Sequence, residues 1–429
     1  MTTSEFILQH RLSNPRDLAL QARRYPDVDM PYALNQIQGW QTARQKLPSW
    51  ASCDGVVYPP HLNMEQCSSE PTARYKQEVA LRWLNKLGVG HGGATTSMAD
   101  LTGGFGVDFS FTSRCFASAT YVERNSSLCD VVSGNLPRLG ISNANVVCAE
   151  AEDSLATMPQ QTMLFLDPAR RDEHGAKTVL IADCTPDVCR LLPQLMSKAR
   201  FVMLKLSPML DWHKAIADLK GTVDEVHIVS VGGECKELLL VLAGKVPVSS
   251  VDSGSLENGV RVYCVDIMPK AEADGEYKRS EFCYTIGGAA DNPPTLNPQP
   301  STPNSQLSTL NSQFLFEPNA SIMKAGCFAE LSQVYGVEAI GPNSHLFVSS
   351  GRVEQFPGRK FAIEAVCTLN KRQLKQTLGT LKQANIAVRN FPMSVAELRK
   401  RLKLRDGGDT YIFATTTKDG EHVLIICRK

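Results

Sequence analysis

The stretch from about residue 97 to residue 243 constrains the fold most, because strand-sized apolar segments alternate there with helix-sized segments. We predict strands at 97–101, 117–122, 145–149, 162–166, 201–204, 223–231 and 237–242, and helices at 127–139, 187–196 and 213–219. This alternation is typical of a parallel α/β sheet with helices on both faces, closed here by an antiparallel hairpin over Gly232 and Gly233. Ligands of such sheets bind at the carboxyl ends of the strands, so the residues that follow each strand are the first candidates for a site.

A glycine-rich turn follows the first predicted strand, in the sequence Asp100-Leu-Thr-Gly-Gly-Phe-Gly106. Glycine allows positive φ angles and lets a ligand lie directly against the backbone. A triphosphate-binding loop would need a lysine after Gly106, and a dinucleotide-binding turn would need a glycine in place of Phe109. What remains is an acid four residues before the pair Gly104-x-Gly106, which resembles the first motif of class I S-adenosylmethionine (SAM) methyltransferases.

Acidic residues also end the next two strands. Glu123, after the second strand, is suited to accept both ribose hydroxyls of SAM, and Glu150, after the third, is placed to receive the adenine amine, with Glu152 and Asp153 as alternatives. A single carboxylate at a loop start often only caps a helix, whereas three at successive strand ends behind a glycine turn indicate one ligand. The predicted cofactor-binding residues are Asp100, Thr102, Gly104, Gly106, Glu123 and Glu150.

The fourth strand ends in Asp167-Pro168-Ala169-Arg170, which resembles the Asp-Pro-Pro-aromatic motif of methyltransferases that act on exocyclic amines of bases. In that chemistry the acid and backbone carbonyls accept the amine hydrogens and direct the nitrogen lone pair at the methyl group. Here Ala169 replaces the second proline and Arg170 replaces the aromatic residue. An arginine can stack on a base or hold a phosphate, or it can form a surface ion pair together with Arg171. We predict Asp167, Pro168 and Arg170 as the catalytic residues.

Two further features near this loop leave alternatives open. Lys205, after the fifth strand, either meets a substrate phosphate or the cofactor carboxylate, or pairs with Asp167. Base-carbon methyltransferases need a cysteine nucleophile beside the fourth-strand loop, but Cys184 and Cys189 come after another apparent strand. We therefore predict direct transfer to a base nitrogen.

A polar cluster precedes the glycine turn and consists of Gln66, Ser68, Ser69, Thr72 and Lys76. Ser69 is suited to cap a helix that has Pro71 in its first turn and runs through Leu84. The cluster either lines the mouth of the ligand site or only caps this helix and faces solvent. The residues before it are predicted to be helical, with breaks at prolines.

The stretch from 246 to 358 is less regular. We predict strands at 259–265 and 279–285 and a helix at 322–335. Between 290 and 313 the sequence is polar, rich in proline and nearly repetitive, which predicts a mobile insertion that cannot bury a core.

The C-terminal part carries a segregated positive charge. Between Arg359 and Arg405 there are 12 Lys and Arg against 2 acidic residues, whereas the whole chain has a formal net charge of +1. An exposed helix that only confers solubility normally mixes its charges, so this excess indicates a nucleic-acid backbone as partner. We predict a β-α-β-α-β-β module from 361 to 427, with helices at 372–384 and 394–402, and with Lys382 nearly in line with 371 and 375 on the first helix. The predicted nucleic-acid-binding residues are Lys371, Arg372, Lys375, Arg399, Lys400 and Arg401.

The composition excludes several classes of protein. The 13 cysteines form no CxxC pair and no zinc-spaced set with the 8 histidines, which predicts reduced thiols and no metal site. The N-terminal sequence has no signal peptide, and no apolar run approaches the roughly 18–20 residues that span a bilayer. We therefore predict a cytoplasmic protein without a membrane segment.

Together the motifs resemble a bacterial, Bacteroidetes-type family of class I SAM-dependent methyltransferase proteins with a C-terminal THUMP-like domain. Besides the segments above, the resemblance rests on Glu65–Glu70, Glu317-Pro-Asn-Ala320, Phe356-Pro-Gly-Arg359 and Arg389-Asn-Phe-Pro392. It implies a Rossmann-like class I methyltransferase sheet, a ferredoxin-like linker domain and a small α+β THUMP-like domain of the RNA-binding type. The domains are then a helical N-terminal region at 1–90, the methyltransferase domain at 91–245, the ferredoxin-like domain at 246–358 with its insertion at 290–313, and the THUMP-like domain at 359–429.

The leading hypothesis from the sequence is a SAM-dependent methyltransferase that acts on RNA. THUMP domains accompany tRNA-modifying enzymes, so tRNA or rRNA is the expected partner by analogy. One alternative is a non-catalytic RNA-binding protein with a retained SAM fold. Another is a methyltransferase that acts on a small molecule or a protein.

Overall fold

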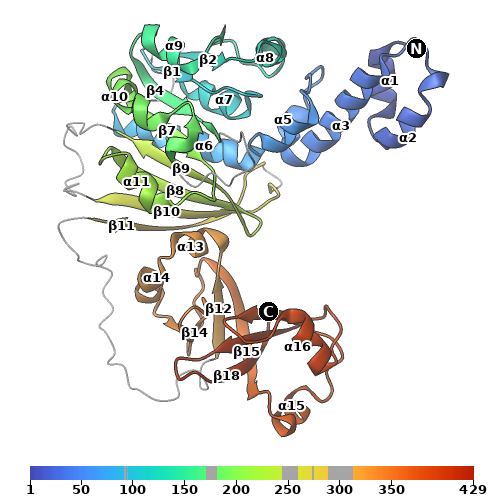
Figure 1. Cartoon of the computed structure of the whole chain (residues 1–429), viewed down its shortest axis with the longest axis vertical. Coiled ribbons are helices and arrows are strands. Elements are labelled where there is room, and N and C mark those ends of the chain that lie inside the picture. Colours follow the sequence, from blue (N-terminus) through green and yellow to red (C-terminus); the bar gives the residue numbers. More distant parts are fainter. Residues whose placement is uncertain (91–92, 94, 171–180, 244–258, 273–274, 288–312) are drawn as a thin grey trace. The chain divides into compact units, whose positions relative to one another are not determined.

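A computed structural model of the chain describes residues 1–90, 93, 95–170, 181–243, 259–272, 275–287 and 313–429, with only the backbone of Arg170 (Figure 1). They form two compact units. Unit 1 comprises Met1–Val231, Lys236–Val260 and Pro269–Tyr277, and unit 2 comprises Gly232–Cys235, Arg261–Met268 and Lys278–Lys429. The predicted insertion at 290–313 lies outside the described residues except for its last position. In the described part of the chain, no helix is both long and apolar enough to cross a membrane.

Unit 1 begins with helices, as the sequence predicts. They are α1 (Thr3–His10), α2 (Pro15–Leu20), α3 (Met30–Lys46), α4 (Pro48–Ala51), α5 (His61–Gln66) and α6 (Glu70–Lys86). Four prolines mark helix starts, because each lies in the first turn of α2, α3, α4 or α6, where a backbone N–H is not needed. Trp50 and Tyr58 pack with Phe105 in one apolar core, with the Trp50 and Phe105 ring centroids 4.9 Å apart. The helical region therefore anchors the glycine turn from one side.

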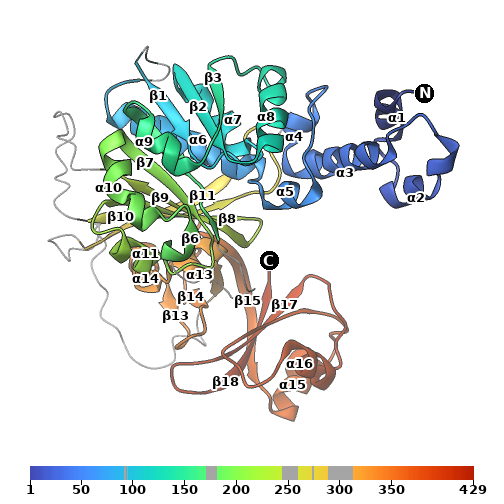
Figure 2. The same ribbon diagram turned by 45° about the horizontal axis from the view of Figure 1, so that its top comes forward.

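The sheet of unit 1 is doubly wound (Figure 2). Its strands are β1 (Ser97–Asp100), β2 (Ser118–Glu123), β3 (Ala144–Cys148), β4 (Gln161–Leu166), β7 (Ala199–Leu206), β8 (Val223–Val231) and β9 (Glu234–Leu242). They lie in the order β3-β2-β1-β4-β7-β9-β8; the first five are parallel, and β9 is antiparallel to β7. The strand order reverses between β1 and β4, which is where a doubly wound sheet opens a crevice for a ligand.

Five helices lie along the chain between the strands of this sheet. They are α7 (Val107–Thr112), α8 (Ser126–Arg138), α9 (Ala151–Thr157), α10 (Val188–Lys198) and α11 (Trp212–Asp218). Phe109 is fully buried in α7 and packs edge-on against Tyr121, with ring centroids 5.6 Å apart. A side chain of this size where a dinucleotide-binding turn has its last glycine agrees with the exclusion of that ligand.

Unit 2 is built on a seven-stranded sheet. Its strands are β12 (Phe314–Pro318), β13 (Glu338–Ala339), β14 (Phe347–Ser349), β15 (Gly358–Thr368), β16 (Asn385–Arg389), β17 (Thr410–Thr416) and β18 (His422–Arg428). The order is β13-β14-β12-β15-β18-β17-β16, and all neighbours are antiparallel except β16 and β17. The described strands β10 (Val260–Ile267) and β11 (Arg279–Ile286) precede them.

Four helices complete the described part of unit 2, namely α13 (Ala320–Ala325), α14 (Phe328–Tyr335), α15 (Lys371–Leu378) and α16 (Val395–Leu402). The last two pack Leu378 and Leu398 against one face of the sheet. The β-α-β-α-β-β module predicted from the sequence is therefore present.

Two predicted helices of unit 2 are wrong in extent. The helix expected at 322–335 is interrupted, because Gly326 adopts φ +73° and ends α13 before α14 begins. The basic helix expected at 372–384 ends at Leu378, because residues 382–384 bond to the backbone of Arg405 instead. Lys382 is consequently not on the same helix as Lys371 and Lys375.

Candidate functional site

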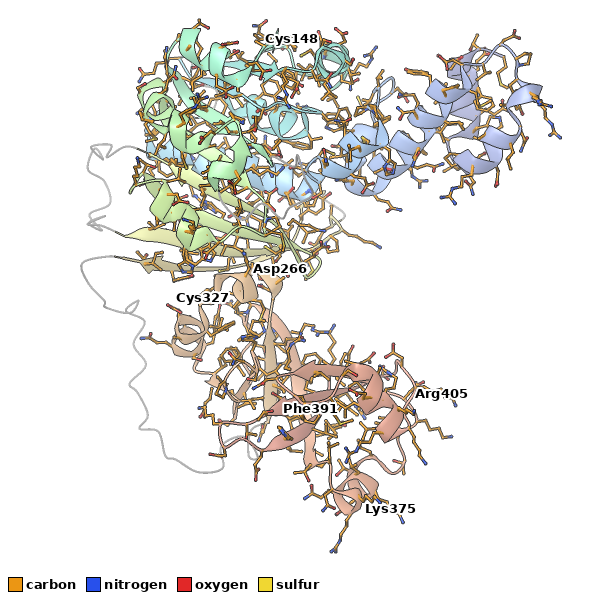
Figure 3. The ribbon with its side chains drawn as sticks, viewed as in Figure 1. Cys148, Asp266, Cys327, Lys375, Phe391 and Arg405 are labelled. Atoms are coloured by element: carbon orange, nitrogen blue, oxygen red, sulfur yellow. The ribbon has the colours of Figure 1, made fainter. Side chains whose placement is uncertain are left out.

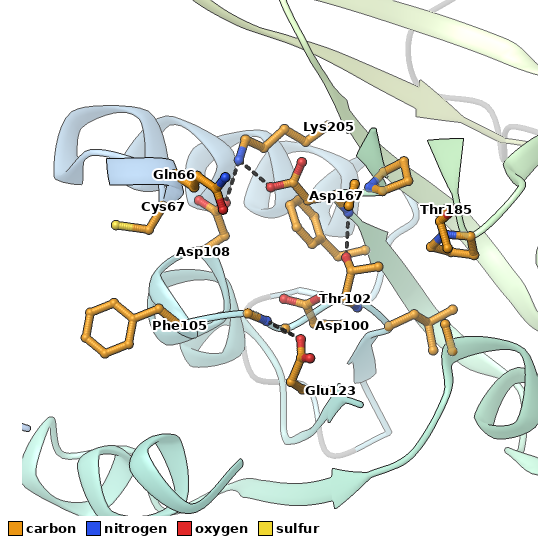
Figure 4. Close-up of a pocket in the computed structure, with 18 of the residues that line it drawn as sticks. Gln66, Cys67, Asp100, Thr102, Phe105, Asp108, Glu123, Asp167, Thr185 and Lys205 are labelled. Atoms are coloured by element: carbon orange, nitrogen blue, oxygen red, sulfur yellow. Dashed lines mark hydrogen bonds and ion pairs between the residues drawn. The ribbon is translucent and has the colours of Figure 1, made fainter. Parts of the chain in front are cut away.

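A cavity of about 730 Å³ opens at the carboxyl ends of the parallel strands of unit 1 (Figure 4). Eight of the predicted site residues line it, namely Asp100, Thr102, Gly104, Gly106, Glu123, Glu150, Asp167 and Pro168. Arg170 ends the short strand β5 (Ala169–Arg170), and its side chain lies outside the described part of the structure. The alternation of strands and helices thus brings residues that are far apart in the sequence to one edge of the sheet.

The glycine turn is shaped by contacts on one side and open on the other. Asp100 is buried at the end of β1 and accepts the backbone N–H of Thr102 at 3.0 Å. A Cβ on Gly103 would lie 2.1 Å from the Tyr121 ring, so only glycine fits there. Gly104 has φ +54°, and a Cβ placed on it would meet no atom closer than 3.9 Å. The turn therefore leaves free space beside bare backbone, as a tightly bound ligand needs.

Glu123 holds the turn from the end of β2. Its Oε2 accepts the N–H of Gly104 at 3.0 Å, and its Oε1 accepts the N–H of Asn125 at 2.9 Å, while the Tyr121 hydroxyl donates to the Gly104 carbonyl. A carboxylate oxygen has two lone pairs, so both oxygens can still accept a bond from a ligand. Glu150 occupies the N-cap of α9, where its exposed side chain makes no capping hydrogen bond.

Asp167 is fixed at the end of β4 by its neighbours. Its backbone N–H donates to Thr102 Oγ1 at 2.6 Å, and Lys205 Nζ donates to its Oδ2 at 2.5 Å. Of the roles left open for Lys205, pairing with Asp167 is the one found. Asp167 Oδ1 has no hydrogen-bond partner among the described residues. Burial opposes the charge of Lys205, but the carboxylates of Asp167, Asp108 and Glu237 raise its pKa above the usual value, which keeps it an ammonium.

Behind Lys205 lies a buried charge cluster that the sequence did not reveal, formed by Lys76, Asp108, Lys205 and Glu237. Lys76 is fully buried, with its Nζ 2.5 and 2.7 Å from the Glu237 oxygens and 3.2 Å from Asp108 Oδ1. Ser68 Oγ donates to Asp108 Oδ2 at 2.7 Å, and Lys205 lies 3.8 Å from the same oxygen.

Burial opposes the negative charge of both acids of the cluster, but the nearby lysines outweigh it only for Asp108. It raises the pKa of Glu237, whereas for Asp108 the nearby Lys76 and Lys205 outweigh burial and lower the pKa. Lys76 belongs to the polar cluster noted in the sequence, but Glu237 lies in a strand whose following residues are apolar and gave no signal. Of the other polar-cluster residues, Gln66 and Ser68 line the cavity, and Ser69 occupies the N-cap of α6 without a side-chain bond to its backbone.

The expected separation of Cys184 from the fourth-strand loop is wrong. Strand β5 pairs with β6 (Cys184–Thr185), an unpredicted short hairpin that places Cys184 in the cavity lining. Cys67 lines the cavity as well, and burial raises the pKa of its thiol, so it is a poor nucleophile. Among the described residues, no group of three or more metal-ligating side chains is placed to hold a metal ion.

The predicted nucleic-acid-binding residues lie on the two helices of the C-terminal module. Lys371, Arg372 and Lys375 on α15 are exposed, as are Lys400 and Arg401 on α16. Figure 3 shows Lys375 pointing away from the domain. Arg399 differs from the rest, because it is half-buried and donates to Asp406 at 2.6 Å and to the Ala384 carbonyl at 3.3 Å. It therefore supports the module rather than offering a free cation.

Two protein-family models match the C-terminal part of the chain. Residues 358–429 match a model described as THUMP domain-like, and residues 314–357 match a ferredoxin-like domain model. No curated protein sequence matches the chain. The C-terminal part of the chain therefore contains a ferredoxin-like and a THUMP-like domain, as the resemblance implies.

Among solved structures, the chain is similar over its whole length to one described as "Crystal structure of putative methyltransferase from Porphyromonas gingivalis W83". The sequence identity is 27%, the TM-score is 0.77, and the match covers 100% of this chain and 97% of that one. The resemblance stated from the motifs is thereby confirmed.

Two further matches cover less of the chain. One is an rRNA methylase from Streptococcus thermophilus, with 11% identity, a TM-score of 0.30, and 41% of this chain and 98% of that chain covered. The other is precorrin-6y C5,15-methyltransferase from Geobacter metallireducens GS-15, with 18% identity, a TM-score of 0.28, and 39% and 88% covered. Neither of these two matches bears on the substrate.

Proposed function

We propose that this protein is a SAM-dependent methyltransferase that transfers a methyl group directly to a base nitrogen of RNA. The observation that carries the proposal is the meeting of Asp100, Gly104, Glu123 and Asp167 around one cavity at the reversal point of the sheet. Each residue comes from a different strand end or turn. Each has the chemistry that one part of SAM or of the acceptor base requires.

The residues of the cavity fit SAM. The open backbone at Gly104 accommodates a ligand that lacks phosphates, and the carboxylate of Glu123, fixed by two backbone N–H groups, is suited to hold the ribose hydroxyls. Glu150 is free to accept the adenine amine. SAM, when bound, supplies a methyl group already activated by a positively charged sulfur. The acid Asp100 in the cavity lining complements that positive charge.

The chain's own contribution to transfer is to orient the acceptor. Lys205 occupies Oδ2 of Asp167, which leaves Oδ1 to accept a hydrogen from an amine on the substrate base. Thr102 fixes the backbone of Asp167, so a bond to Oδ1 would set the direction of the nitrogen lone pair. Positioning of this kind can supply most of the rate enhancement when the donor is already activated.

RNA as the substrate class is supported by the C-terminal module. It matches a THUMP-like domain model and exposes Lys371, Arg372, Lys375, Lys400 and Arg401. Such surfaces bind phosphate backbones largely without regard to sequence, so base selection would fall to the cavity of unit 1.

The decisive experiment measures methyl transfer and cofactor binding in the same variants. Purified protein is incubated with methyl-labelled SAM and with tRNA or rRNA from a strain that lacks the gene, and the labelled nucleoside is identified by mass spectrometry. We expect labelled RNA with the wild-type protein, and no label with Asp167→Asn, which still binds SAM. An Asp167→Asn variant of full activity would refute the assigned role, and SAM-binding protein that labels no RNA would favour the non-catalytic alternative.

Cofactor binding is measured by calorimetry. Glu123→Gln removes a charged acceptor and is expected to weaken SAM binding by roughly tenfold or more. Asp130→Asn, an exposed acid on α8 outside the cavity lining, is the matched control and is expected to bind SAM as the wild type does. Equal affinities for the two variants would contradict the cofactor site.

A further inference from the structure

Three motifs that the proposed reaction does not use meet around one carboxylate in unit 2. Glu317 on β12 accepts from Arg359 Nε on β15 at 2.6 Å and from Arg389 Nη2 at the end of β16 at 2.8 Å. Arg359 binds one carboxylate oxygen, Oε2, and Arg389 binds the other, Oε1. The two guanidinium groups are therefore held next to each other, and we refer to them as the arginine pair.

The charges at this place do not balance. The Glu317 side chain is only 6% exposed, and its single negative charge neutralises only one of the two guanidinium groups. The arginine side chains are 51% and 39% exposed, so the excess positive charge faces solvent. Two other carboxylates of the unit are paired elsewhere, Glu338 with Lys418 and Glu364 with Arg428. One arginine would be enough to join Glu317 to a second strand. Two guanidinium groups repel each other, and a bound anion would relieve that repulsion.

The arginine pair also keeps donors for a ligand. Arginine carries five N–H donors, and Nη1 of Arg359 and Nε of Arg389 have no partner among the described residues. The Arg359 guanidinium lies over the Phe361 ring, 5.6 Å from its centroid, and Arg389 Nη1 donates to the Val388 carbonyl at 3.2 Å. Both groups are thus oriented before any ligand arrives, which lowers the entropy cost of binding.

The surrounding loops add features typical of a binding site rather than a plain surface. Asn343, His345 and Asn390 all have positive φ, near +50°, although none is glycine. Asn390 Nδ2 donates to the Pro342 carbonyl at 2.7 Å, which joins the loop after β13 to the end of β16. Burial and the charge of Arg389 lower the pKa of His345, in keeping with the uncompensated positive charge beside it.

We propose that the arginine pair, organised by Glu317, binds a phosphodiester group of the RNA. One phosphodiester carries the single negative charge that the site lacks, and its two free oxygens match the planar fork of a guanidinium. The exposed lysines of α15 bind phosphate as mobile point charges, whereas the arginine pair would fix the RNA at one position on the sheet. The inference rests on the proposed function in one respect, namely that the ligand is RNA.

The test is a titration of the full-length protein with fluorescent unfractionated tRNA over a series of KCl concentrations. Arg359→Gln and Arg389→Gln are each expected to weaken binding by roughly tenfold and to reduce the slope of log K against log salt by about 1. The matched controls are Arg352→Gln and Arg428→Gln, two exposed arginines of unit 2 that pair with Glu354 and Glu364. They are expected to leave affinity and slope unchanged.

Lysine variants separate binding from folding. Arg359→Lys and Arg389→Lys keep the charge and an ion pair with Glu317 but lack the fork. If they unfold at the wild-type temperature and bind tRNA more weakly, the proposal is supported even when the glutamine variants fail to fold. Lysine and glutamine variants that bind tRNA with wild-type affinity and slope would overturn it.

Two further measurements on the same samples distinguish the possible failures. They are SAM binding and the unfolding temperature in the presence of inorganic phosphate. Wild-type protein that binds SAM but not tRNA would refute both the RNA substrate and this inference. If wild-type protein binds tRNA and the variants match it, only the inference fails. Inorganic phosphate that raises the unfolding temperature of the wild type but not of the double lysine variant, without any effect of the pair on tRNA affinity, would assign the site to free phosphate and overturn an RNA role.

Discussion

Replacing Lys76 with methionine tests whether the buried charge cluster holds helix α6 to the sheet. Methionine fills a similar volume but leaves Glu237 and Asp108 buried without their closest cation, because Lys205 lies 3.8 Å from Asp108. Removing one partner of a buried ion pair costs about 3–5 kcal/mol. For a domain of this size each kcal/mol lowers the unfolding temperature by about 2–4 °C, so a drop of roughly 6–20 °C is expected.

The measurement is calorimetric and denaturant-induced unfolding of the wild type, Lys76→Met, Glu237→Gln and the double variant. The double variant is expected to regain much of the stability lost by Lys76→Met, because the uncompensated buried charge is gone. Lys214→Met breaks an exposed pair with Asp218 on α11 and serves as the control, with an expected change below about 0.5 kcal/mol. The reasoning is refuted if Lys76→Met unfolds at the wild-type temperature, or if the losses of the two single variants simply add.

The pH dependence of Lys76→Met has a definite sign. Burial already raises the pKa of Glu237 above 4.5, and loss of the lysine removes a cause that lowers it. An acid whose pKa is higher in the folded state binds its proton more tightly there. The stability of the variant is therefore expected to be greatest below about pH 4.5 and to fall as the pH rises through the raised pKa of Glu237, relative to wild type.

Three further predictions concern the glycine turn. Burial raises the pKa of Asp100 well above 3.8, so a cationic ligand beside it should drive proton release, and SAM affinity should increase as the pH rises towards that raised pKa. Calorimetry in buffers of different ionisation enthalpy checks this, and Asp100→Asn should show no such release. Gly103→Ala places a Cβ 2.1 Å from the Tyr121 ring and should destabilise the fold by about 1–3 kcal/mol in denaturant unfolding. The added Cβ of Gly104→Ala meets no close atom, so the free energy of unfolding should fall by only about 1–2 kcal/mol, owing to the positive φ. The same methyl group should weaken SAM binding. Unchanged SAM affinity would contradict a ligand at this backbone.

The predicted elements of unit 1 succeeded where the pattern was local. The strands at 97–101, 117–122 and 162–166 agree with β1, β2 and β4 within one residue at each end, because each apolar run is bounded by polar turns. In unit 2, two helices were predicted to be longer than they are. The helices at 322–335 and 372–384 failed because Gly326 and the pairing of residues 382–384 with Arg405 are tertiary events that helical periodicity does not record.

The residues of the site also differ in whether the sequence alone could reveal them. Asp100, Glu123 and Asp167 could be found because each lies at the end of a strand or directly after it, and the topology of a parallel sheet gathers such positions at one edge. Cys184 was misplaced because the hairpin of β5 and β6 has only two residues in each strand, too short for a periodic signal. Glu237 was missed because a single charge at the start of an apolar strand gives no indication of its partner.

The sequence by itself determined the doubly wound sheet, the positions of the acids at its strand ends and the basic character of the C-terminal module. These features depend on periodicity, turn chemistry and charge counts, which are properties of short segments. Only the tertiary structure decided the partners. It paired Lys205 with Asp167, buried Lys76 between Glu237 and Asp108, and brought Arg359 and Arg389 to opposite oxygens of Glu317. The physical reason is that a charge contributes through its distance and burial, and both are set by residues remote in the sequence.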